Sequence, residues 1–513
     1  MHLREGFDYP LSRLDPFGDH IDPPSVAIYE TVVVKGPDGG AHPALAESWD
    51  ISEDKLRWTF HIRPGLRFHS GDPCDAPAVL QALEQLRWGF HGGRQLWYWD
   101  PVDTVVANDE RTLTFTLHHP YVRLPSLLWG THTAIHNEAR RARYPDGSGY
   151  QYADGTGPFR LVSYTPERVV AERWADYPGS PARFLATGGP AHLAGIEWTM
   201  LLDPAERVAA LEAGTVDCIH GPNYADVARL EADPRFRVTR FRQAANAYLG
   251  LNWDRTDLGF DDLRVRRGIS RALDRAQLVA DALLGYGAPT LGPLSPGGEF
   301  YDPIVETVGA DLPDAGRLLD DAGWTVGSDG IREKDGRRLA FECVIQDDTI
   351  HRAIAEGMRD QLLRAGVQVE LRPVRTFKAF YAEVLNGPAS FINKWLWQDP
   401  VDAAIGFTAT WGSPRPNWQH ASIPVLDDAY RGWLRAETPE ELQAAATKAQ
   451  VIVADQLPYI PLLVPDDVWV NANRVTGWDP AQSILYPFYH TTTVTPDGAE
   501  SRQTKTQAGE ETR

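Results

Sequence analysis

Cysteine is scarce in this chain of 513 residues, which contains only Cys74, Cys218 and Cys343. The three lie far apart in the sequence, and none of them belongs to a CxxC pair. The sequence therefore predicts neither a zinc site nor a network of disulfides. A single disulfide between two of the three stays an open alternative.

Long apolar runs are also absent. No stretch reaches the roughly 18 consecutive apolar residues that a membrane-spanning helix requires. The opening residues, MHLREGFDYPLSRLDP, lack the apolar h-region of a secretory signal peptide. We therefore expect neither a membrane span nor a signal peptide in this sequence.

Positive charge is in deficit, since 50 Lys and Arg residues face 70 Asp and Glu residues, which gives a formal net charge of −20. A chain of this charge is repelled by nucleic-acid phosphates and by anionic lipid head groups. We therefore expect no nucleic-acid partner and no binding to an anionic membrane surface.

Catalytic signatures are missing too, because the sequence contains no GxSxG, HExxH, GxxxxGK[ST] or EF-hand pattern. GTGPFR, which begins at Gly155, carries a GxG, but a proline stands where a phosphate-binding helix would begin. His132 and His136 are four residues apart and would share a face on a helix. We favour ordinary surface or interface histidines over metal ligands. The sequence predicts no catalytic residue, no metal ligand and no cofactor.

The periodicity of the chain indicates alternating strands and helices. A chain of this length is too long for one core, so two or three lobes are expected. Alternating apolar residues and helical periodicity predict strands at 56–63, 111–120, 247–254 and 367–374, and helices at 75–86, 350–365 and 377–385. DDLRVRRGISRALDRAQLVADALLGYG predicts a pair of helices, with Asp274 as the N-cap of the second. The pattern is typical of a mixed α/β protein with substantial parallel sheet.

Tryptophan, in contrast, is abundant, with 17 residues. In KWLWQDPVD, which begins at Lys394, Trp395 and Trp397 are two apart and so share one face of a strand. Asp399 and Pro400 then have the residue types of an N-cap and an N1 position, which predicts the start of a helix. Trp411 adds a further indole nearby. Both a pocket wall and core filling stay open for Trp395 and Trp397.

Four segments in order resemble one family. They are HPALAESWDISEDKLRWTFHIRPGLRFHSGDP, GTGPFRLVSY, DDLRVRRGISRALDR and KWLWQDP. Together they are similar to the family 5 extracytoplasmic solute-binding proteins of ABC importers, which include oligopeptide-, dipeptide- and nickel-binding proteins. The resemblance extends from about Leu11 to Tyr489.

The resemblance implies an α/β protein with the two-lobe periplasmic-binding-protein-like fold (type II) and an extra subdomain inserted in the first lobe. Two strands between the lobes would serve as a hinge. The segments map onto this sequence as lobe one at 1–40, 156–245 and 466–494, the inserted subdomain at 41–155, lobe two at 246–465, and a disordered polar tail at 495–513.

The resemblance also implies a function. Such a protein, expected to be a monomer without enzymatic activity, closes on a small-molecule ligand and presents it to the permease subunits of an ABC importer. The family implies an extracytoplasmic location. Because no signal peptide is expected, two alternatives stay open: a cytoplasmic relative that serves as a biosynthetic enzyme, or one that serves as a ligand sensor.

The expected ligand-binding residues lie around the Asp-Pro pair, and they are Asn393, Trp395, Trp397, Gln398 and Trp411. In the family's peptide binders, an aspartate just before this pair binds the α-ammonium group of the peptide. Residues 393–398 contain no carboxylate, and Lys394 adds a positive charge. We therefore expect a flat, uncharged or anionic ligand, such as a sugar, an aromatic compound or a modified peptide, rather than a peptide with free termini.

Overall fold

A computed structural model describes most of the chain. The residues that it describes are 1–8, 14, 23–89, 99–130, 133–143, 153–243, 245–304, 309–386, 390–396, 417–480 and 488–496. Structural statements below refer to these residues.

A mixed sheet of twelve described strands runs through the molecule. Its order is β19-β18-β20-β13-β21-β11-β1-β10-β9-β8, and β12 and β14 also pair with β21. The strands are β1 (His2–Phe7), β8 (Phe159–Thr165), β9 (Arg168–Arg173), β10 (Gly195–Met200), β11 (Cys218–His220), β12 (Phe236–Arg242), β13 (Ala245–Gly250), β14 (Gly287–Pro289), β18 (Ala340–Gln346), β19 (Gln368–Val374), β20 (Ser390–Leu396) and β21 (Ile460–Ala472).

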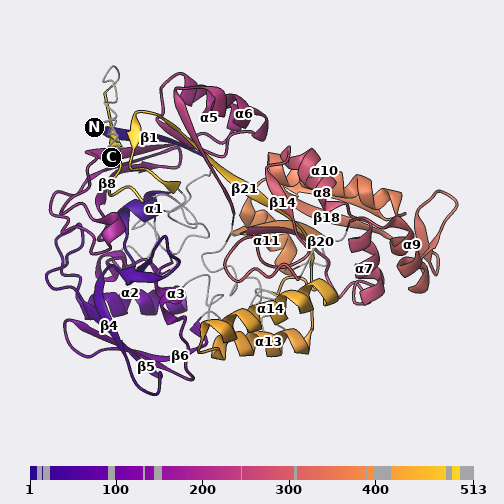
Figure 1. Cartoon of the computed structure of the whole chain (residues 1–513), viewed down its shortest axis with the longest axis horizontal. Helices are drawn as coiled ribbons and strands as arrows, with labels where there is room; N and C mark the ends of the chain where they lie inside the picture. Colours follow the sequence, from indigo (N-terminus) through magenta and orange to yellow (C-terminus); the bar gives the residue numbers. More distant parts are fainter. Residues whose placement is uncertain are drawn as a thin grey trace, which may run out of the picture.

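The sheet has two halves that β21 joins. The first half contains β8, β9, β10, β1, β11 and β12, and the second contains β13, β14, β18, β19 and β20. The start of β21 pairs with β13 and β14, and its end, from Asp466 to Ala472, pairs with β12. Figure 1 shows β21 running between these two parts of the molecule, with the N-terminus near β1 in the first. We call residues 464–467, where the pairs with β14 end and those with β12 begin, the β21 crossing.

A separate antiparallel sheet of four strands lies at one end of the molecule, in the order β4-β5-β7-β6. These strands are β4 (Ala46–Ile51), β5 (Arg57–Ile62), β6 (Val102–Ala107) and β7 (Thr112–Leu117). Short pairs complete the strands: β2 (Val33–Lys35) with β3 (Ala41–Pro43), β15 (Thr325–Val326) with β16 (Arg332–Lys334) and β17 (Arg337–Arg338), and β22 (Val475–Thr476) with β23 (Thr493–Val494).

Helices cover these sheets. Those packed with the first half and with the four-stranded sheet are α1 (Pro23–Ile28), α2 (Ala76–Gly89), α3 (Leu124–Leu128), α4 (Glu138–Arg141), α5 (Pro204–Glu212) and α6 (Tyr224–Ala232). Those of the second half are α7 (Leu263–Arg271), α8 (Arg275–Leu283), α9 (Leu312–Asp321), α10 (Thr349–Arg364), α11 (Phe377–Asn386), α13 (Pro424–Arg435) and α14 (Pro439–Gln456).

Buried apolar residues form separate cores in the two halves. Leu3, Phe7 and Trp198 belong to the core of the first half, and Leu249, Phe341 and Met358 to that of the second. A third cluster includes residues of the four-stranded sheet, such as Phe60, and also residues of α13 and α14, such as Trp433. The four-stranded sheet and these helices of the second half are thus linked by one continuous apolar cluster.

Most elements expected from periodicity are present. The strand expected at 56–63 is β5, the helix at 75–86 is α2, and the helix at 350–365 is α10. The predicted helix pair is confirmed as α7 and α8, and the Asp274 carboxylate accepts a 2.9 Å hydrogen bond from the backbone N–H of Gln277. Parallel pairing is confirmed between β1 and both β10 and β11, and between β18 and both β19 and β20.

The glycines of GTGPFR have a packing role. A Cβ atom at Gly155 would lie 2.2 Å from the carbonyl oxygen of Ile28, and one at Gly157 would lie 2.5 Å from that of Ala27. Residues 155 and 157 therefore have no room for a side chain, because the end of α1 packs against their backbone. This close approach accounts for the motif without a phosphate ligand.

The three cysteines are free and buried, which answers the open question of a disulfide. Cys74, Cys218 and Cys343 belong to three different apolar clusters. Each therefore serves as a small apolar side chain.

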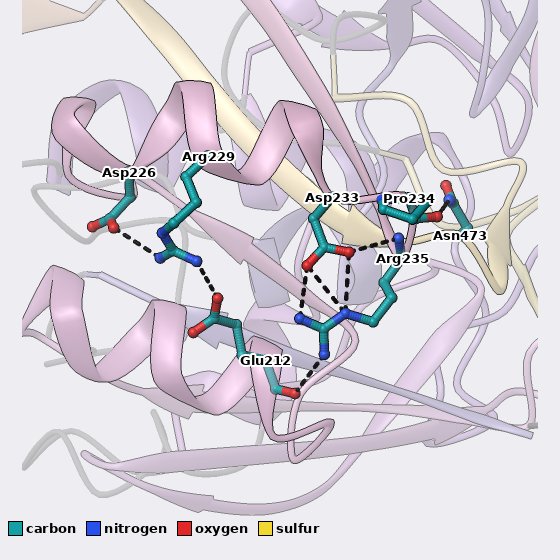
Figure 2. A network of polar contacts seen from close by, with 7 residues as sticks. All are labelled: Glu212, Asp226, Arg229, Asp233, Pro234, Arg235 and Asn473. Atoms are coloured by element: carbon teal, nitrogen blue, oxygen red, sulfur yellow. Dashed lines mark hydrogen bonds and ion pairs between the residues drawn. The ribbon is translucent and has the colours of Figure 1, made fainter.

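Ion pairs and hydrogen bonds on the surface link α5, α6 and the segment before β12 (Figure 2). Arg229 of α6 bonds to Asp226 and to Glu212 of α5. Arg235, at the start of β12, bonds to Asp233, and Asn473, just after β21, donates to the carbonyl of Pro234 at 2.5 Å. Solvent screens such exposed pairs, so we expect them to add little to stability.

Candidate functional site

The parallel strands of both sheet halves end at the β21 crossing. β11 runs antiparallel to β21, and the backbone N–H of Gly221, just past its carboxyl end, donates to the carbonyl of Val468. β1 is parallel to β11, so its carboxyl end points the same way. In the second half, β13 is antiparallel to both β20 and β21, so β20 runs along β21 and ends near Leu463. The carboxyl ends of the two halves therefore converge on residues 464–467, and ligands of open α/β sheets bind at such ends.

The carboxyl-end edge of the second half carries amide side chains. Asn393 of β20 is buried, and its side-chain oxygen lies 3.5 Å from the amide nitrogen of Gln346, the last residue of β18. Asn246 of β13 is also buried, and its amide nitrogen donates to the carbonyl of Gly292 at 2.8 Å. Gln243, between β12 and β13, is buried as well, and its backbone N–H donates to the carbonyl of Pro465.

Of the five expected ligand-binding residues, the structure describes Asn393 and the backbone of Trp395. Asn393 lies on β20 opposite Tyr248, and the backbone of Trp395 lies on β20 opposite Asn246. Trp397, Gln398 and Trp411 lie outside the described residues, as do Asp399 and the helix expected after it. The strand expected to carry Trp395 and Trp397 is present as β20 as far as Leu396, and Trp397 lies outside the described residues.

The carboxyl-end edge of the first half carries a histidine between two carboxylates. The Nδ1 atom of His220 lies 2.9 Å from Asp8, and its Nε2 atom lies 2.6 Å from Asp467 of the β21 crossing. Burial opposes a charge on the ring, but the carboxylates of Asp8 and Asp467 outweigh it and raise the pKa of His220 to about 10. The ring also lies against Trp469, with 4.3 Å between ring centroids. His220 is therefore a cation that holds the end of β1 to the β21 crossing.

Glu5 is a second ionisable residue of the first half. Its side chain is fully buried, and it accepts a 2.9 Å hydrogen bond from the hydroxyl of Tyr489. Burial raises the pKa of Glu5 to about 8, despite the hydrogen bond from Tyr489. Glu5 is therefore mainly protonated and uncharged at neutral pH.

The other described carboxylates at the two edges already have partners. Asp466 pairs with Arg242 at 2.5 Å. Asp347, just after β18, pairs with Arg352, and Asp348 bonds to His351 and caps α10. The edges thus present neutral amides together with carboxylates that are each bonded to an arginine or a histidine.

Contacts between the two parts of the molecule lie beyond these edges. Glu299 lies 3.3 Å from the Nζ atom of Lys35 and 3.4 Å from Arg123. The Arg123 guanidinium also lies over the rings of Phe300 and Trp433, at 5.3 and 5.0 Å from their centroids. Arg123 therefore contacts both the loop after β14 and helix α13.

Sequence reasoning missed His220, Asp8, Asp467, Asn246 and Gln243. Asp8 directly follows β1, and His220 is the last residue of β11. Polar residues at the carboxyl ends of strands can indicate a site, but this signal requires that both strands are first predicted from the sequence. No pattern in the sequence indicated that residue 467 would meet residues 8 and 220.

The structure gives no sign of a metal site or membrane span in the part of the chain that it describes. No group of three His, Cys, Asp or Glu side chains is placed there to hold a metal ion. His136 is buried and lies 3.0 Å from Glu138, in a segment that is not helical, so the shared helix face considered for it is wrong. No described helix is long and apolar enough to cross a bilayer.

Comparisons with known proteins agree on one family. The family model for bacterial extracellular solute-binding proteins, family 5 (middle region), matches residues 40–418. The chain is 24% identical over 455 residues to the glutathione-binding protein GsiB of Pectobacterium atrosepticum, covering 86% of this chain and 84% of that one. It is 25% identical over 452 residues to the nickel-binding periplasmic protein of Escherichia coli, covering 85% and 83%.

A solved structure has the same fold. It is the periplasmic binding protein DppA of Helicobacter pylori in complex with a peptide, at a TM-score of 0.83 and 22% identity, covering 96% of this chain and 98% of that one. The two-lobe fold class and the family resemblance predicted from the sequence are confirmed. These relatives are named as binding proteins. The chain belongs to the bacterial extracellular solute-binding proteins of family 5.

Proposed function

We propose that this protein captures a small solute between its two lobes at the β21 crossing and delivers it to the permease subunits of an ABC importer. The observation that carries the proposal is the convergence of the carboxyl ends of β1 and β11 with those of β18 and β20. Ligands of α/β proteins bind at such ends, and here two sets of ends flank one crossing strand.

The proposed lobes follow the boundaries expected from the sequence. Lobe one consists of 1–40, 156–245 and 466–494, lobe two of 246–465, and the inserted subdomain of 41–155. Support comes from the sheet, because β12 pairs with residues 466–472 whereas β13 pairs with residues 460–463. The chain between β12 and β13 and the β21 crossing would then be the two hinge strands.

The proposed ligand site contains Asn393, Trp395, Trp397, Gln398 and Trp411. The register of β20 supports the first two, since Asn393 and Trp395 are close to its carboxyl end. The ligand is a neutral or anionic compound such as a sugar, an aromatic compound or a modified peptide. We further propose that the protein acts as an extracytoplasmic monomer and that it releases its ligand chemically unchanged.

Calorimetric titration tests the ligand class. Wild-type protein is titrated with neutral glycosides, aromatic acids and unmodified dipeptides, and the titrations are repeated with Trp395→Ala and Trp397→Ala. We expect binding of a glycoside or aromatic compound that each substitution weakens by about threefold to tenfold, as expected for a lost stacking contact of about 0.5–1.5 kcal/mol. Micromolar binding of dipeptides that is indifferent to both substitutions would contradict the proposed site.

A second measurement tests the absence of chemistry. The protein is incubated with the ligand that it binds, and the ligand is recovered and analysed by mass spectrometry. We expect it to be recovered unchanged, and steady turnover would instead favour an enzyme.

A further inference from the structure

Two buried amides at the β21 crossing have oxygen atoms that the described residues leave without a hydrogen-bond donor. They are the Oδ1 atom of Asn246 and the Oε1 atom of Gln243. Asn246 is 1% exposed and Gln243 is 7% exposed, so bulk solvent does not satisfy these atoms. A buried polar atom without a partner is costly, and each such atom calls for an explanation.

The orientation of the Asn246 amide is fixed by its surroundings. Its nitrogen donates to the carbonyl of Gly292 at 2.8 Å. A carbonyl oxygen only accepts hydrogen bonds, so the nitrogen and not the oxygen must face Gly292. The other end of the Asn246 amide is therefore an acceptor, and it needs a donor.

Both residues lie where the carboxyl ends of the two halves converge. Asn246 is paired with Trp395 of β20 in the sheet register, and Gln243 is bonded through its backbone to Pro465 of the β21 crossing. They thus belong to the chain that passes from the first half to the second, beside the predicted site.

The charges nearby indicate which donor fits. The five carboxylates at the two edges (Asp8, Asp347, Asp348, Asp466 and Asp467) are each bonded to an arginine or a histidine. Residues 393–396 of β20, which pairs with Asn246, contain no carboxylate to balance an ammonium group, so burying one beside Asn246 would be costly. A hydroxyl or an amide N–H carries a donor without a net charge.

We propose that Asn246 and Gln243 determine specificity by accepting hydrogen bonds from a neutral ligand rich in hydroxyl or amide N–H donors. This inference rests on the proposed binding function. It specifies that the ligand has neutral hydrogen-bond donors that face Asn246 and Gln243. Ligand binding would then supply hydrogen-bond donors to the Oδ1 atom of Asn246 and the Oε1 atom of Gln243.

The test uses three variants of the full chain. Asn246→Leu and Gln243→Met remove the acceptors at nearly constant side-chain size. Gln361→Met is the matched control, because Gln361 is also a buried amide but has both partners, its oxygen accepting from the backbone N–H of Asp274 and its nitrogen donating to the Asp274 carbonyl. Affinity is measured by calorimetry for cellobiose, for the N-acetylated amide of dialanine and for free dialanine, and thermal unfolding is measured without ligand.

We expect cellobiose or the capped dialanine to bind, with about tenfold loss of affinity in Asn246→Leu and in Gln243→Met and with unchanged affinity in Gln361→Met. The two neutral probes separate hydroxyl donors from amide donors. Unchanged affinity in both site variants, or binding of free dialanine alone, would overturn the proposal.

Thermal unfolding decides the case in which no probe binds. Without ligand, Gln243→Met removes an unsatisfied oxygen, so its Tm should rise by about 1–2 °C, whereas the Tm of Gln361→Met should fall. A fall in both would mean that Gln243 is satisfied by the protein or by a buried water, which contradicts the proposal. A separate experiment tests the proposed function itself. Small-angle scattering of wild-type protein is measured with and without a small-molecule extract of its host, and an unchanged radius of gyration would contradict ligand capture between the lobes.

Discussion

Two buried ionisable residues of the first half, Glu5 and His220, have pKa values far from their ordinary ones. Both are raised, Glu5 to about 8 and His220 to about 10, but the cause differs. Burial raises the pKa of Glu5, whereas two carboxylates raise that of His220 against the effect of burial. Burial keeps Glu5 protonated and neutral, whereas two carboxylates stabilise the charged form of His220. Substitution of Glu5 should therefore relieve a cost to stability at high pH, whereas substitution of His220 should remove a stabilising interaction.

Glu5→Gln should make the protein less sensitive to rising pH. Between the ordinary pKa near 4.5 and the folded pKa of about 8, the unfolded chain loses its proton while the folded protein keeps it. The stability of the wild type therefore falls by about 1.4 kcal/mol per pH unit in this window from this group. Glutamine does not titrate and retains an acceptor for Tyr489. Urea unfolding at pH 5, 6.5 and 8 should show the variant gaining on the wild type as pH rises, and parallel pH profiles would contradict this.

His220→Gln should destabilise the protein, by about 3–5 kcal/mol, because it leaves Asp8 and Asp467 without the cation that they share. The contribution of His220 is complete below the ordinary pKa of 6.5 and is lost as pH rises through about 10. The difference from wild type in urea unfolding should therefore shrink between pH 7 and pH 10. His42→Gln, which removes an exposed pair with Asp38, is the control and should have a much smaller effect.

At the scale of the element, local chemistry sets the helix boundaries and long-range contacts set the position of loops. The N-caps of α8 and α10 are aspartates with the expected bonds, Asp274 and Asp348. The loop after β14, in contrast, is held by residues far away in sequence. Its Gly292 carbonyl binds Asn246, and its Glu299 binds Lys35 and Arg123.

Asp274→Ala should lower the free energy of unfolding by about 1 kcal/mol, because the first turn of α8 loses the bond to the N–H of Gln277. Urea unfolding measures the change. Asp274→Asn keeps a capping oxygen and should recover most of it. Equal losses in both variants would show that the charge, and not the cap, is what matters.

Arg123→Ala should favour an open form of the protein. The substitution removes contacts with Glu299, Phe300 and Trp433 that link the two parts of the molecule. A partly buried cation over aromatic rings contributes about 1–2 kcal/mol, so we expect a larger radius of gyration and a fivefold to thirtyfold weaker ligand affinity. Lys55→Ala, which removes a more exposed pair with Glu437, is the control. An unchanged radius and affinity in Arg123→Ala would exclude a role in closure.

At the scale of the whole molecule, β21 joins two lobes, and the carboxyl ends of the parallel strands of both lobes face the β21 crossing. Such a design converts ligand binding into a change of shape, because a ligand that touches both edges favours the closed form. β21 supplies the continuity, since it pairs with strands of both halves.

Ligand addition should contract the protein and stabilise it. We expect a monomer of 57.1 kDa by light scattering with and without ligand. At a ligand concentration of 100 Kd the unfolding free energy should rise by about 2.7 kcal/mol. Small-angle scattering should show a smaller radius of gyration in the same sample. Stabilisation without contraction would mean that the ligand binds one lobe only.

The sequence by itself determined the elements and the family. Periodicity located β5, α2 and α10, and Asp274 identified the start of α8, because these features depend on residues within one or two turns. Other elements were missed, among them β1, which lies in the centre of the first half yet has polar or small residues at Glu5 and Gly6. Four segments in order were sufficient for the family.

Only the tertiary structure decided which side chains meet. Residues 8, 220 and 467 come together because three strands share one sheet, and the order of strands in a sheet is not written in any local pattern. The same holds for Asn246. Its amide nitrogen donates to the carbonyl of Gly292, a residue 46 positions away, and only this contact shows that its oxygen lacks a donor. Local sequence fixes propensity over a few residues, whereas a binding site between lobes depends on contacts across hundreds of residues.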